Sequence, residues 1–491
     1  MSKHNKLDSD SRSFFKMLAE VIFSNPFSFD KKKIEGMLGR SISEDSDEHH
    51  YSALIPMLNQ HLSQLSLKGI KSITDVSGKN DRMLLEYAYR FETYHDYVDD
   101  FDELINKQLQ QGEEPVDVGF AKPLLKRLID RGLSEQGALR NLALFYQIRR
   151  AYYFIEQTLS GDAECMRQLR HSLWNHVFTY DVRLYQDHLW DRMEDFSTLL
   201  LGETGTGKGT AAAAIGRSGL IAFDTRKGCF NVSFTKTFVA MNLSEFSENL
   251  IESELFGHRK GAFTGAIDHY KGLFERCSKH GSLFLDEIGD VSAQTQIKLL
   301  NVLQDRSYTP VGSHERRRFE GRVIAATNRS LDDLRNQGVF RDDFYYRLSS
   351  DVIEVPTLRQ RLKQCPTELK QLVELLVVRL TGKQSDLLVE KIMNSFSQSL
   401  PVEYPWPGNV RELEQAVRRI IITGEYRIVE HAKTGHENWV NHMLDGEITA
   451  PELLAEYCNM LYSRTGTYEQ VATITELDRR TVKKYIEMVK N

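Results

Sequence analysis

Long apolar runs are missing from this sequence of 491 residues, and cysteine and proline are scarce, with 5 and 11 residues. No segment approaches the roughly 20 apolar residues that cross a bilayer, and the first residues have no apolar stretch of signal-peptide length. The cysteines are scattered, without a Cys-x-x-Cys pair or a Cys/His cluster, which indicates reduced thiols rather than disulfides or zinc. These absences predict a cytoplasmic protein with no membrane partner.

The length and charge predict about three domains and exclude one class of nucleic-acid binder. A chain of 491 residues exceeds what a single core usually organises. The fractions of hydrophobic (41%) and charged (27%) residues are ordinary for a globular protein. A net charge of -6 argues against a protein that coats nucleic acid along its whole surface, but it allows one small DNA-reading module.

Residues 1–164 have a helical pattern with few strand-like alternations. One apolar set recurs every three or four positions: Leu84, Tyr87, Phe91, Tyr94, Val98 and Phe101. This spacing places the set on one face of a helix, and we attribute its aromatic residues to core packing rather than to a ligand pocket. The region is predicted to be a helical N-terminal regulatory domain, and the sequence does not identify its signal.

The strongest local motif is a glycine-rich loop between a strand and a helix. An apolar segment at 197–201 precedes the loop, and an alanine-rich helix follows from Thr210. This order directs backbone N–H groups and a helix N-terminus at a phosphate, and Lys208 adds a positive charge. The motif predicts a Walker A site for ATP. Its residues are Gly202, Glu203, Thr204, Gly205, Thr206, Gly207, Lys208, Gly209 and Thr210.

A second apolar strand, at 281–285, ends in Asp286 and Glu287. A buried strand that delivers two carboxylates beside a phosphate loop suits magnesium binding and water activation. We expect Asp286 to hold Mg²⁺ through water and Glu287 to polarise the attacking water. Gly209 replaces the Ser or Thr that usually binds magnesium, so the metal depends on Asp286 and water or on Thr210. We expect Gly209 to affect the rate of ATP hydrolysis more than the binding of the nucleotide.

A hydrophobic tip with glycine on both sides lies between these two motifs. It consists of Gly261, Ala262, Phe263, Thr264, Gly265 and Ala266. An exposed Phe among small flexible residues buries little surface, so the tip indicates contact with another protein. Its sequence is the GAFTGA loop, and residues 165–430 resemble bacterial enhancer-binding proteins, AAA+ ATPases that activate RNA polymerase carrying sigma-54.

The resemblance implies an α/β AAA+ core with a parallel sheet at about 165–355 and a helical lid at about 356–430. By the same resemblance, Asn242 restrains the catalytic Glu287 and Asn328 is the sensor I residue that reads the γ-phosphate. The stretch 221–237 is longer than usual in this family, and the sequence gives no reason for it.

The segment 340–348 matches the family stretch that supplies arginine fingers to a neighbouring subunit, which implies these roles for Arg341 and Arg347. Local ion pairs with Asp342 and Asp343 are the alternative.

In the lid, we expect Asn409 to cap a helix and Arg411 to reach the nucleotide as sensor II. ATP then lies between core and lid, and the active form is expected to be a hexameric ring. By resemblance, Phe263 and Thr264 contact sigma-54. The basic segment 305–319 is either a companion loop or a solvated hairpin.

The tail at 431–491 begins with a polar connector and ends in a helix, short turn and helix. This arrangement resembles a Fis-like helix-turn-helix, with an ordinary amphipathic helix as the alternative. The candidate DNA contacts are Arg479, Arg480, Thr481, Lys483 and Lys484.

The sequence therefore predicts a sigma-54-dependent activator. It would bind upstream double-stranded DNA as a dimer and hydrolyse ATP in a ring to remodel the closed promoter complex of sigma-54 RNA polymerase holoenzyme. Two alternatives stay open: a ligand-responsive DNA-binding repressor whose ATPase core serves only assembly, and an AAA+ remodeller of another protein.

Overall fold

The computed structural model describes residues 6–28, 35–37, 53–279, 281–348, 351–401, 403–426, 443, 446 and 448–490. Contacts divide the chain into two units, Met1–Met393 with Glu403–Ile422, and Asn394–Val402 with Thr423–Asn491. The predicted connector at 430–447 lies outside the described residues except for Met443 and Gly446. Within the described ranges, no helix has the length and apolar character needed to cross a membrane.

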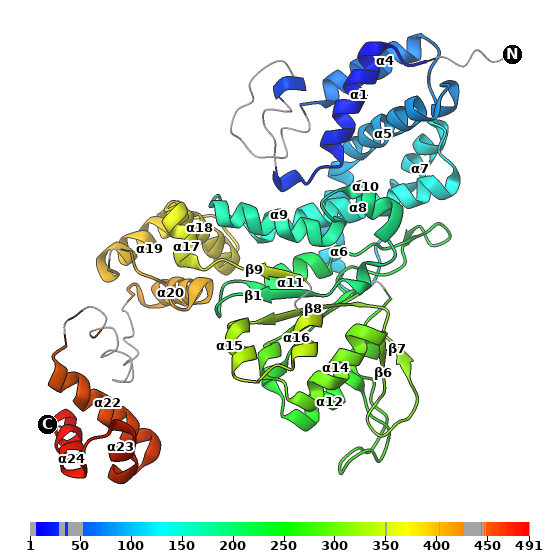
Figure 1. Cartoon of the computed structure of the whole chain (residues 1–491). Coiled ribbons are helices and arrows are strands. Elements are labelled where there is room, and N and C mark those ends of the chain that lie inside the picture. The colour runs from blue at the N-terminus through cyan, green and yellow to red at the C-terminus, as the bar shows by residue number, and fades with distance from the viewer. Residues whose placement is uncertain are drawn as a thin grey trace. The chain divides into compact units, whose positions relative to one another are not determined.

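The N-terminal region is helical, as predicted (Figure 1). Its main helices are α1 (Ser9–Ile22), α4 (Ile55–Leu67), α5 (Lys79–Asp96), α6 (Val98–Gln111), α7 (Ala121–Asp130), α8 (Glu135–Thr158) and α9 (Glu164–Phe178). The prediction of one helix through residues 84–101 is wrong. The chain breaks at Tyr97, where φ is -117°, so Val98 and Phe101 belong to α6.

The core is a parallel five-stranded sheet in the order β4-β5-β8-β1-β9, which confirms the predicted fold class. Its strands are β1 (Thr198–Leu201), β4 (Phe238–Asn242), β5 (Ser282–Asp286), β8 (Arg322–Thr327) and β9 (Val352–Glu354). The central strands β5 and β8 are apolar and almost continuously buried, as expected for strands covered on both faces. Their carboxyl ends meet at one edge, where α/β proteins bind ligands.

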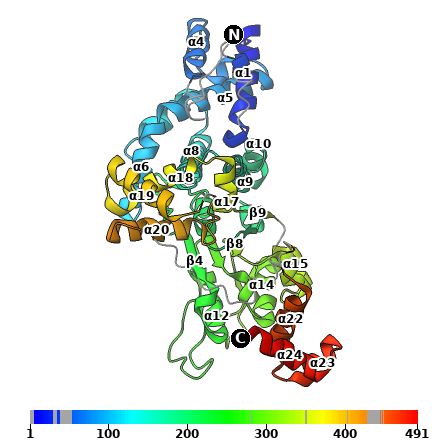
Figure 2. The same cartoon turned by 90° about the vertical axis from the view of Figure 1, so that its left-hand side faces the viewer.

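Helices and hairpins surround this sheet (Figures 1 and 2). The core helices are α11 (Lys208–Gly216), α12 (Glu248–Phe256), α13 (Leu273–Arg276), α14 (Ala293–Asp305), α15 (Leu331–Asn336) and α16 (Asp342–Leu348). The lid helices are α17 (Leu358–Gln364), α18 (Glu368–Thr381), α19 (Asp386–Ser399) and α20 (Asn409–Thr423). Two-stranded hairpins are formed by β2 (Phe223–Asp224) with β3 (Cys229–Phe230), and by β6 (Ser307–Tyr308) with β7 (Arg317–Arg318). The second hairpin occupies the segment expected to be a companion loop or a solvated hairpin.

The unexplained stretch 221–237 docks the N-terminal helices on the core. The Val118 N–H donates to the Gly228 carbonyl at 2.9 Å. The ring of Phe230 stacks on Tyr146 of α8 with centroids 4.1 Å apart. Farther along, the Ser233 hydroxyl donates to the Gly112 carbonyl at 2.8 Å. The helices and the core share one hydrophobic cluster, so the boundary at 164 stays a prediction.

The C-terminal unit contains α22 (Ala450–Thr465), α23 (Tyr468–Thr475) and α24 (Arg479–Lys490). These helices pack around a small core made of Cys458, Leu461, Val471, Val482 and Ile486. The turn between α23 and α24 needs a left-handed residue at Glu476, where φ is 58°.

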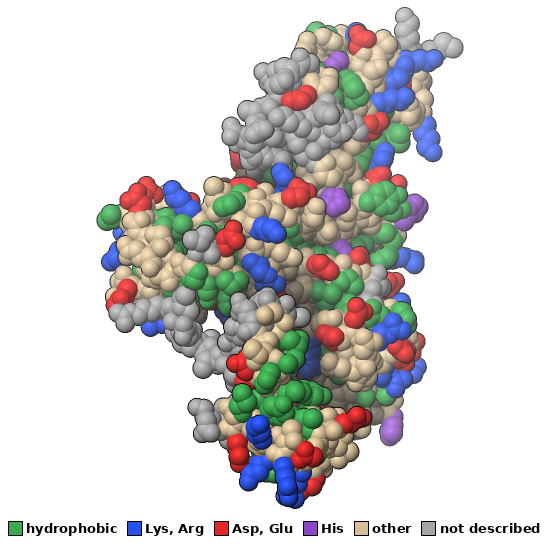
Figure 3. Space-filling view, turned by 60° about the vertical axis from the view of Figure 1, so that its left-hand side comes forward, with side chains coloured by type: hydrophobic (Ala, Val, Ile, Leu, Met, Phe, Trp, Pro, Cys, Tyr) green, Lys and Arg blue, Asp and Glu red, His purple; other side chains and the backbone are tan. Residues whose placement is uncertain are grey.

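Basic and acidic side chains are interspersed over the face of the molecule drawn in Figure 3, in keeping with the small net charge.

Two glycines of α11 differ in their surroundings, and this difference predicts opposite effects of alanine. A Cβ at Gly216 would lie 2.3 Å from the Phe238 ring, whereas a Cβ at Gly209 meets nothing closer than 3.9 Å. Overpacking costs ~1–3 kcal/mol, and alanine gains up to ~1 kcal/mol in a helix. Gly216→Ala should therefore lower the thermal midpoint of the nucleotide-free protein, and Gly209→Ala should leave it equal or higher. A Gly216→Ala protein as stable as wild type would contradict the packing.

Candidate functional site

The Walker A loop has the conformation that its glycines permit. Gly205 and Gly207 have φ values of 80° and 103°. A Cβ at Gly205 would lie 2.3 Å from the Gly408 carbonyl oxygen of the lid, so only glycine fits there. The Val410 N–H at the start of α20 donates to the Gly205 carbonyl at 3.0 Å. Lid and loop therefore touch along their backbones.

Lys208 is buried, and its ammonium group lies on the loop itself. Its Nζ donates to the carbonyls of Gly202 at 2.8 Å and Glu203 at 3.2 Å. Burial lowers the pKa of Lys208, and the charges of Glu287 and Asp286 oppose this shift. Phosphate oxygens are stronger hydrogen-bond acceptors than backbone carbonyls. The Lys208 ammonium group can therefore exchange these two carbonyls for the phosphates of a bound nucleotide.

The two predicted acids lie beside this lysine at the carboxyl end of β5. The register of β4 and β5 places Asn242 beside Asp286, and Asp286 Oδ1 accepts the Glu287 N–H at 3.0 Å. Glu287 has a left-handed backbone with φ of 55°. Burial raises the pKa of Glu287, the Asp286 charge adds to this effect, and Lys208 opposes it. A carboxylate with a raised pKa is a better proton acceptor for an attacking water.

The two predicted asparagines differ in what they contact. Asn328 Nδ2 donates to the Thr204 hydroxyl at 2.9 Å, which brings the end of β8 to the Walker A loop. Asn242 Oδ1 instead accepts from the N–H of Ser244 at 3.1 Å and from its hydroxyl at 2.9 Å. The restraint of Glu287 by Asn242 therefore stays a prediction.

Asn409 joins the lid to the loop, so the expectation that it caps its own helix is wrong. Its Oδ1 accepts the Leu358 N–H at 2.9 Å, and its Nδ2 donates to Glu203 Oε2 and the Thr204 carbonyl, both at 3.1 Å. Arg359, which the sequence reasoning missed, pairs with Glu203 through both carboxylate oxygens. In the sequence, the only sign of this ion pair was that the positive charge of Arg359 is opposite to that of Glu203 in the loop.

Arg411 extends from the first turn of α20 toward the same site. Its Cβ lies 3.0 Å from the position that a Cβ on Gly205 would take, and its charge contributes to the lowered pKa of Lys208. This placement suits a residue that reads the nucleotide from the lid.

The two candidate arginine fingers have local partners. Arg341 is exposed and pairs with Asp343 at 2.9 Å, which matches the alternative interpretation of this segment. Arg347 donates through Nε and a terminal nitrogen to the Leu303 carbonyl, at 3.1 and 2.8 Å. Arg341 is thus the more accessible of the two, and Arg347 supports α14 within its own subunit.

The GAFTGA tip is exposed at Gly261, Phe263, Thr264 and Gly265, whereas Ala262 is half-buried and Ala266 is buried. The base of the tip is fixed. Phe263 is 40% exposed, and its ring lies edge-on to His258 at 4.9 Å. The two sides of the base are joined by hydrogen bonds between His258 and Tyr270 at 3.1 and 3.0 Å. The Arg259 N–H donates to the Val311 carbonyl at 3.0 Å, which ties the tip to the β6–β7 connection. In Figures 1 and 2, the segment after α12 projects from the core away from the N-terminal helices.

The residues near Asp286 fit a magnesium ion held mostly by water and phosphate. Magnesium keeps several waters and uses one or two carboxylates plus substrate phosphates. Asp286 is half-buried, and Gly209 and Thr210 are exposed. Among the described residues, no cluster of His, Cys, Asp or Glu forms a complete metal cage. Asp286 through water, with Thr210 as an additional oxygen, is the donor set that remains.

The last helix of the C-terminal unit, α24, presents most of the predicted DNA-binding residues. Arg479, Arg480, Lys483 and Lys484 are exposed on α24. Thr481 differs, because its hydroxyl donates to Asp478 Oδ2 at 2.6 Å and helps to begin the helix. Its role as a base contact is thereby weakened.

Two domain families match this chain. Residues 186–354 match the family described as Sigma-54 interaction domain, and residues 366–437 match the AAA+ ATPase lid domain. Together they cover the sheet, the tip and the lid helices α18 to α20, while α17 lies between the two matches.

Curated relatives match over the same part of the chain. The DNA-binding transcriptional regulator NtrC of Rhizobium meliloti is 41% identical over 46% of this chain and 43% of its own length. The Nif-specific regulatory protein of Azotobacter vinelandii is 41% identical over 47% and 40%. The transcriptional regulatory protein ZraR of Escherichia coli is 40% identical over 47% and 48%. This chain therefore spans less than half of the length of these relatives.

The raised pKa of Glu287 predicts a pH-dependent stability difference. The folded state holds the Glu287 proton more tightly than the unfolded state, so stability is greatest below the unfolded pKa and falls as pH rises through the folded pKa. Glu287→Gln should be more stable than wild type at neutral pH, and the difference should shrink on acidification. Thermal unfolding across pH measures it, and Glu245→Gln, which removes an exposed carboxylate, is the control. A Gln variant less stable at every pH would contradict the inferred environment.

Proposed function

We propose that this chain is an ATP-driven activator of sigma-54 RNA polymerase, because residues 186–354 match the Sigma-54 interaction domain and residues 366–437 match the AAA+ ATPase lid domain. The observation that supports it most is the exposed Phe263 tip on a core whose two Walker motifs meet at one sheet edge. An exposed aromatic loop or a nucleotide site alone would suit many proteins. The two together suit an ATPase that acts on a protein partner.

Hydrolysis is assigned to groups that already lie together. Lys208 moves from the carbonyls of Gly202 and Glu203 to the β- and γ-phosphate oxygens. Glu287 orients the attacking water and accepts its proton, for which its raised pKa is suited. Asp286 would hold magnesium through water, and bound magnesium would neutralise charge on the phosphates.

Completion of the site requires a neighbouring subunit. An arginine supplied by another subunit stabilises the charge that develops on the transferred phosphoryl group. Arg341 suits this role better than Arg347, because the only described partner of its side chain is the exposed Asp343 on α16. A ring assembly would place such an arginine at every subunit junction, and it gives the nucleotide a means of coordinating neighbours.

A continuous segment joins the nucleotide site to the tip. Asn242 ends β4 beside Asp286 and caps the turn that leads into α12. At the other end of α12, the Ser253 hydroxyl is hydrogen-bonded to His258 Nδ1 at 2.7 Å. The His258 ring in turn contacts Phe263. A shift of α12 on nucleotide binding would therefore move the tip directly.

The exposed tip also favours this function over the two alternatives. A repressor with a purely structural ATPase core has no use for an aromatic side chain held out on a loop with a fixed base. A remodeller of another protein would use such a tip, but it would act without sigma-54. Transcription from a sigma-54 promoter with purified components separates these possibilities.

Phe263→Ala should abolish activation while leaving ATP hydrolysis near the wild-type rate, because Phe263 is remote from the Walker motifs. Truncation of a central aromatic contact commonly costs ~2 kcal/mol, or ~30-fold in affinity. Ile267→Ala is the matched control, since Ile267 is 75% exposed in the same loop but outside the tip. Transcription and phosphate release are measured on the same preparations. Full activation by Phe263→Ala would refute the role of the tip.

The exposed basic residues of α24 are proposed to bind upstream DNA. Arg480→Ala and Lys484→Ala should each weaken binding to duplex DNA, and each phosphate partner removed should reduce the slope of log affinity against log salt by about 1. Arg464→Ala removes an equal charge from exposed surface on α22 and is the control. Fluorescence anisotropy over a salt series measures both quantities. Equal decreases in all three variants would mean that only net charge matters.

A further inference from the structure

The N-terminal helices enclose a cavity of about 500 Å³. It lies between the end of α1, the α5–α6 junction, α8 and α9, all within the first unit. Small-molecule sites usually have volumes of about 300–1,000 Å³. Tyr87, Phe91 and Tyr94 pack in the hydrophobic core, as expected, and they also line this cavity.

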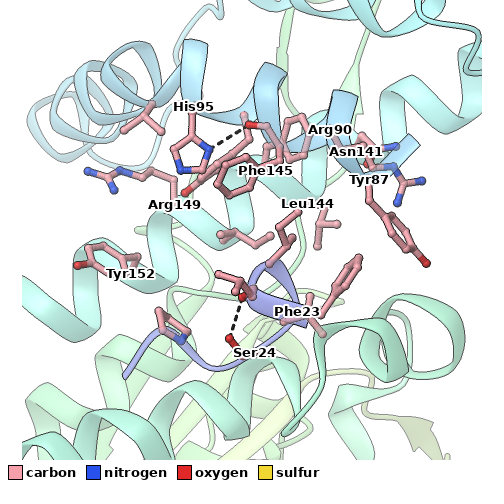
Figure 4. A pocket seen from close by; sticks show the side chains of 18 of the residues that line it. Phe23, Ser24, Tyr87, Arg90, His95, Asn141, Leu144, Phe145, Arg149 and Tyr152 are labelled. Carbon is pink, nitrogen blue, oxygen red and sulfur yellow. Dashed lines mark hydrogen bonds between the residues drawn. The ribbon is translucent and has the colours of Figure 1, made fainter. Parts of the chain in front are cut away.

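The wall is mostly aromatic and aliphatic, with polar groups near its ends (Figure 4). Leu144 and Phe145 of α8 lie in the middle of the view. Arg149 and His95 lie at one end, and Arg90 lies at the other. Such a wall suits a molecule with a flat apolar body rather than a sugar or a nucleotide.

Two buried donors at this wall are unsatisfied. The indole Nε1 of Trp174 and the Nε of Arg90 have no hydrogen-bond partner among the described residues. Trp174 is only 4% exposed, so bulk water does not readily serve it. Both nitrogen atoms are inaccessible even to a water molecule, so they do not determine which groups a molecule in the cavity must carry.

Arg149 and His95, two other polar groups of the wall, have partners within the protein. Arg149 pairs with both oxygens of Asp102, each at 2.5 Å. His95 Nδ1 is bonded to the Phe91 carbonyl at 3.0 Å. Because a carbonyl only accepts, that nitrogen carries the proton and Nε2 is left as an acceptor. The charges of Arg149 and Asp102 thus compensate each other, and most of the remaining wall is apolar.

The helix that forms the middle of the wall also holds the Walker A helix. On the opposite face of α8, Gln147 Nε2 donates to the Ser218 carbonyl at 2.9 Å. Arg150 is fully buried and donates to the carbonyls of Arg217 and Gly219, the latter at 2.7 Å. These carbonyls follow the C-terminal end of α11, where a cation also complements the helix dipole.

We propose that this cavity is a binding site for a small molecule with an apolar, ring-containing body, and that α8 transmits its occupancy to the Walker A helix. The binding part is independent of the proposed function, whereas the transmission part rests on nucleotide binding at Lys208. A ligand that shifts α8 changes the support of α11, so ligand and nucleotide affinities are coupled.

The binding part is tested with 1-anilinonaphthalene-8-sulfonate, a ring-containing sulfonate, on the full-length folded protein. Its fluorescence titration should saturate at one site per chain. Leu144→Trp fills the cavity and should weaken this binding at least ~10-fold, a difference of ~1.4 kcal/mol. Gln136→Trp adds the same side chain on the exposed start of α8 and should leave binding unchanged. Equal binding by wild type and a folded Leu144→Trp, or no saturable binding, overturns the assignment.

The transmission part is tested by reciprocity. A non-hydrolysable ATP analogue should change the dye dissociation constant, by ~5-fold or more for a typical coupling, and the dye should change analogue affinity by the same factor. Arg150→Met should keep dye binding and abolish the coupling. Should that variant not fold, Gln147→Met removes the neighbouring hydrogen bond to Ser218. Independent binding of dye and analogue to wild type overturns the transmission. Failure to bind the analogue at all contradicts the proposed function and leaves the cavity assignment standing.

Discussion

The backbone contact between the lid and the Walker A loop is the constraint on which the nucleotide site depends. Gly205 and Gly408 approach so closely that a Cβ on Gly205 would overlap the Gly408 carbonyl oxygen. Once the backbones touch, Asn409 satisfies polar groups of both sides, and Arg359 neutralises the carboxylate of Glu203. A nucleotide that enters between loop and lid must work against this contact, so binding and lid position are linked by geometry.

The same phosphate-binding helix is held at its other end by the N-terminal region. Arg150 and Gln147 bind the carbonyls that follow α11, and the β2–β3 hairpin fixes α8 beside the sheet. Thus the lid holds the N-terminal end of one short helix, and α8 holds its C-terminal end. A helix of 9 residues clamped at both ends cannot tilt freely. Under the proposed coupling, a movement of α8 would act on α11, whose first residue is Lys208.

The sequence was sufficient for features that are local and insufficient for those that depend on contacts between distant segments. The Walker motifs could be predicted because a strand, a glycine loop and a helix are continuous in the chain, and parallel strands bring their ends together. The partners of Asn409 and Thr481 could not, because a capping residue and a linking residue look alike until the neighbouring elements are placed. Tyr97 shows a related limit: periodicity continued through a break that only φ records.

Gly209 shows how the structure sharpens a question that the sequence only raised. Glycine in a helix costs up to ~1 kcal/mol relative to alanine, and such a cost is often offset by a close contact that only glycine allows. Among the described residues Gly209 has no such contact, since the nearest atom to a Cβ at this position would be in the Phe284 ring at 3.9 Å. Packing therefore does not explain the missing hydroxyl. If Glu287 activates water, as proposed, Asp286 and Thr210 would be the oxygen donors beside it for magnesium, and phosphates and water would supply the rest.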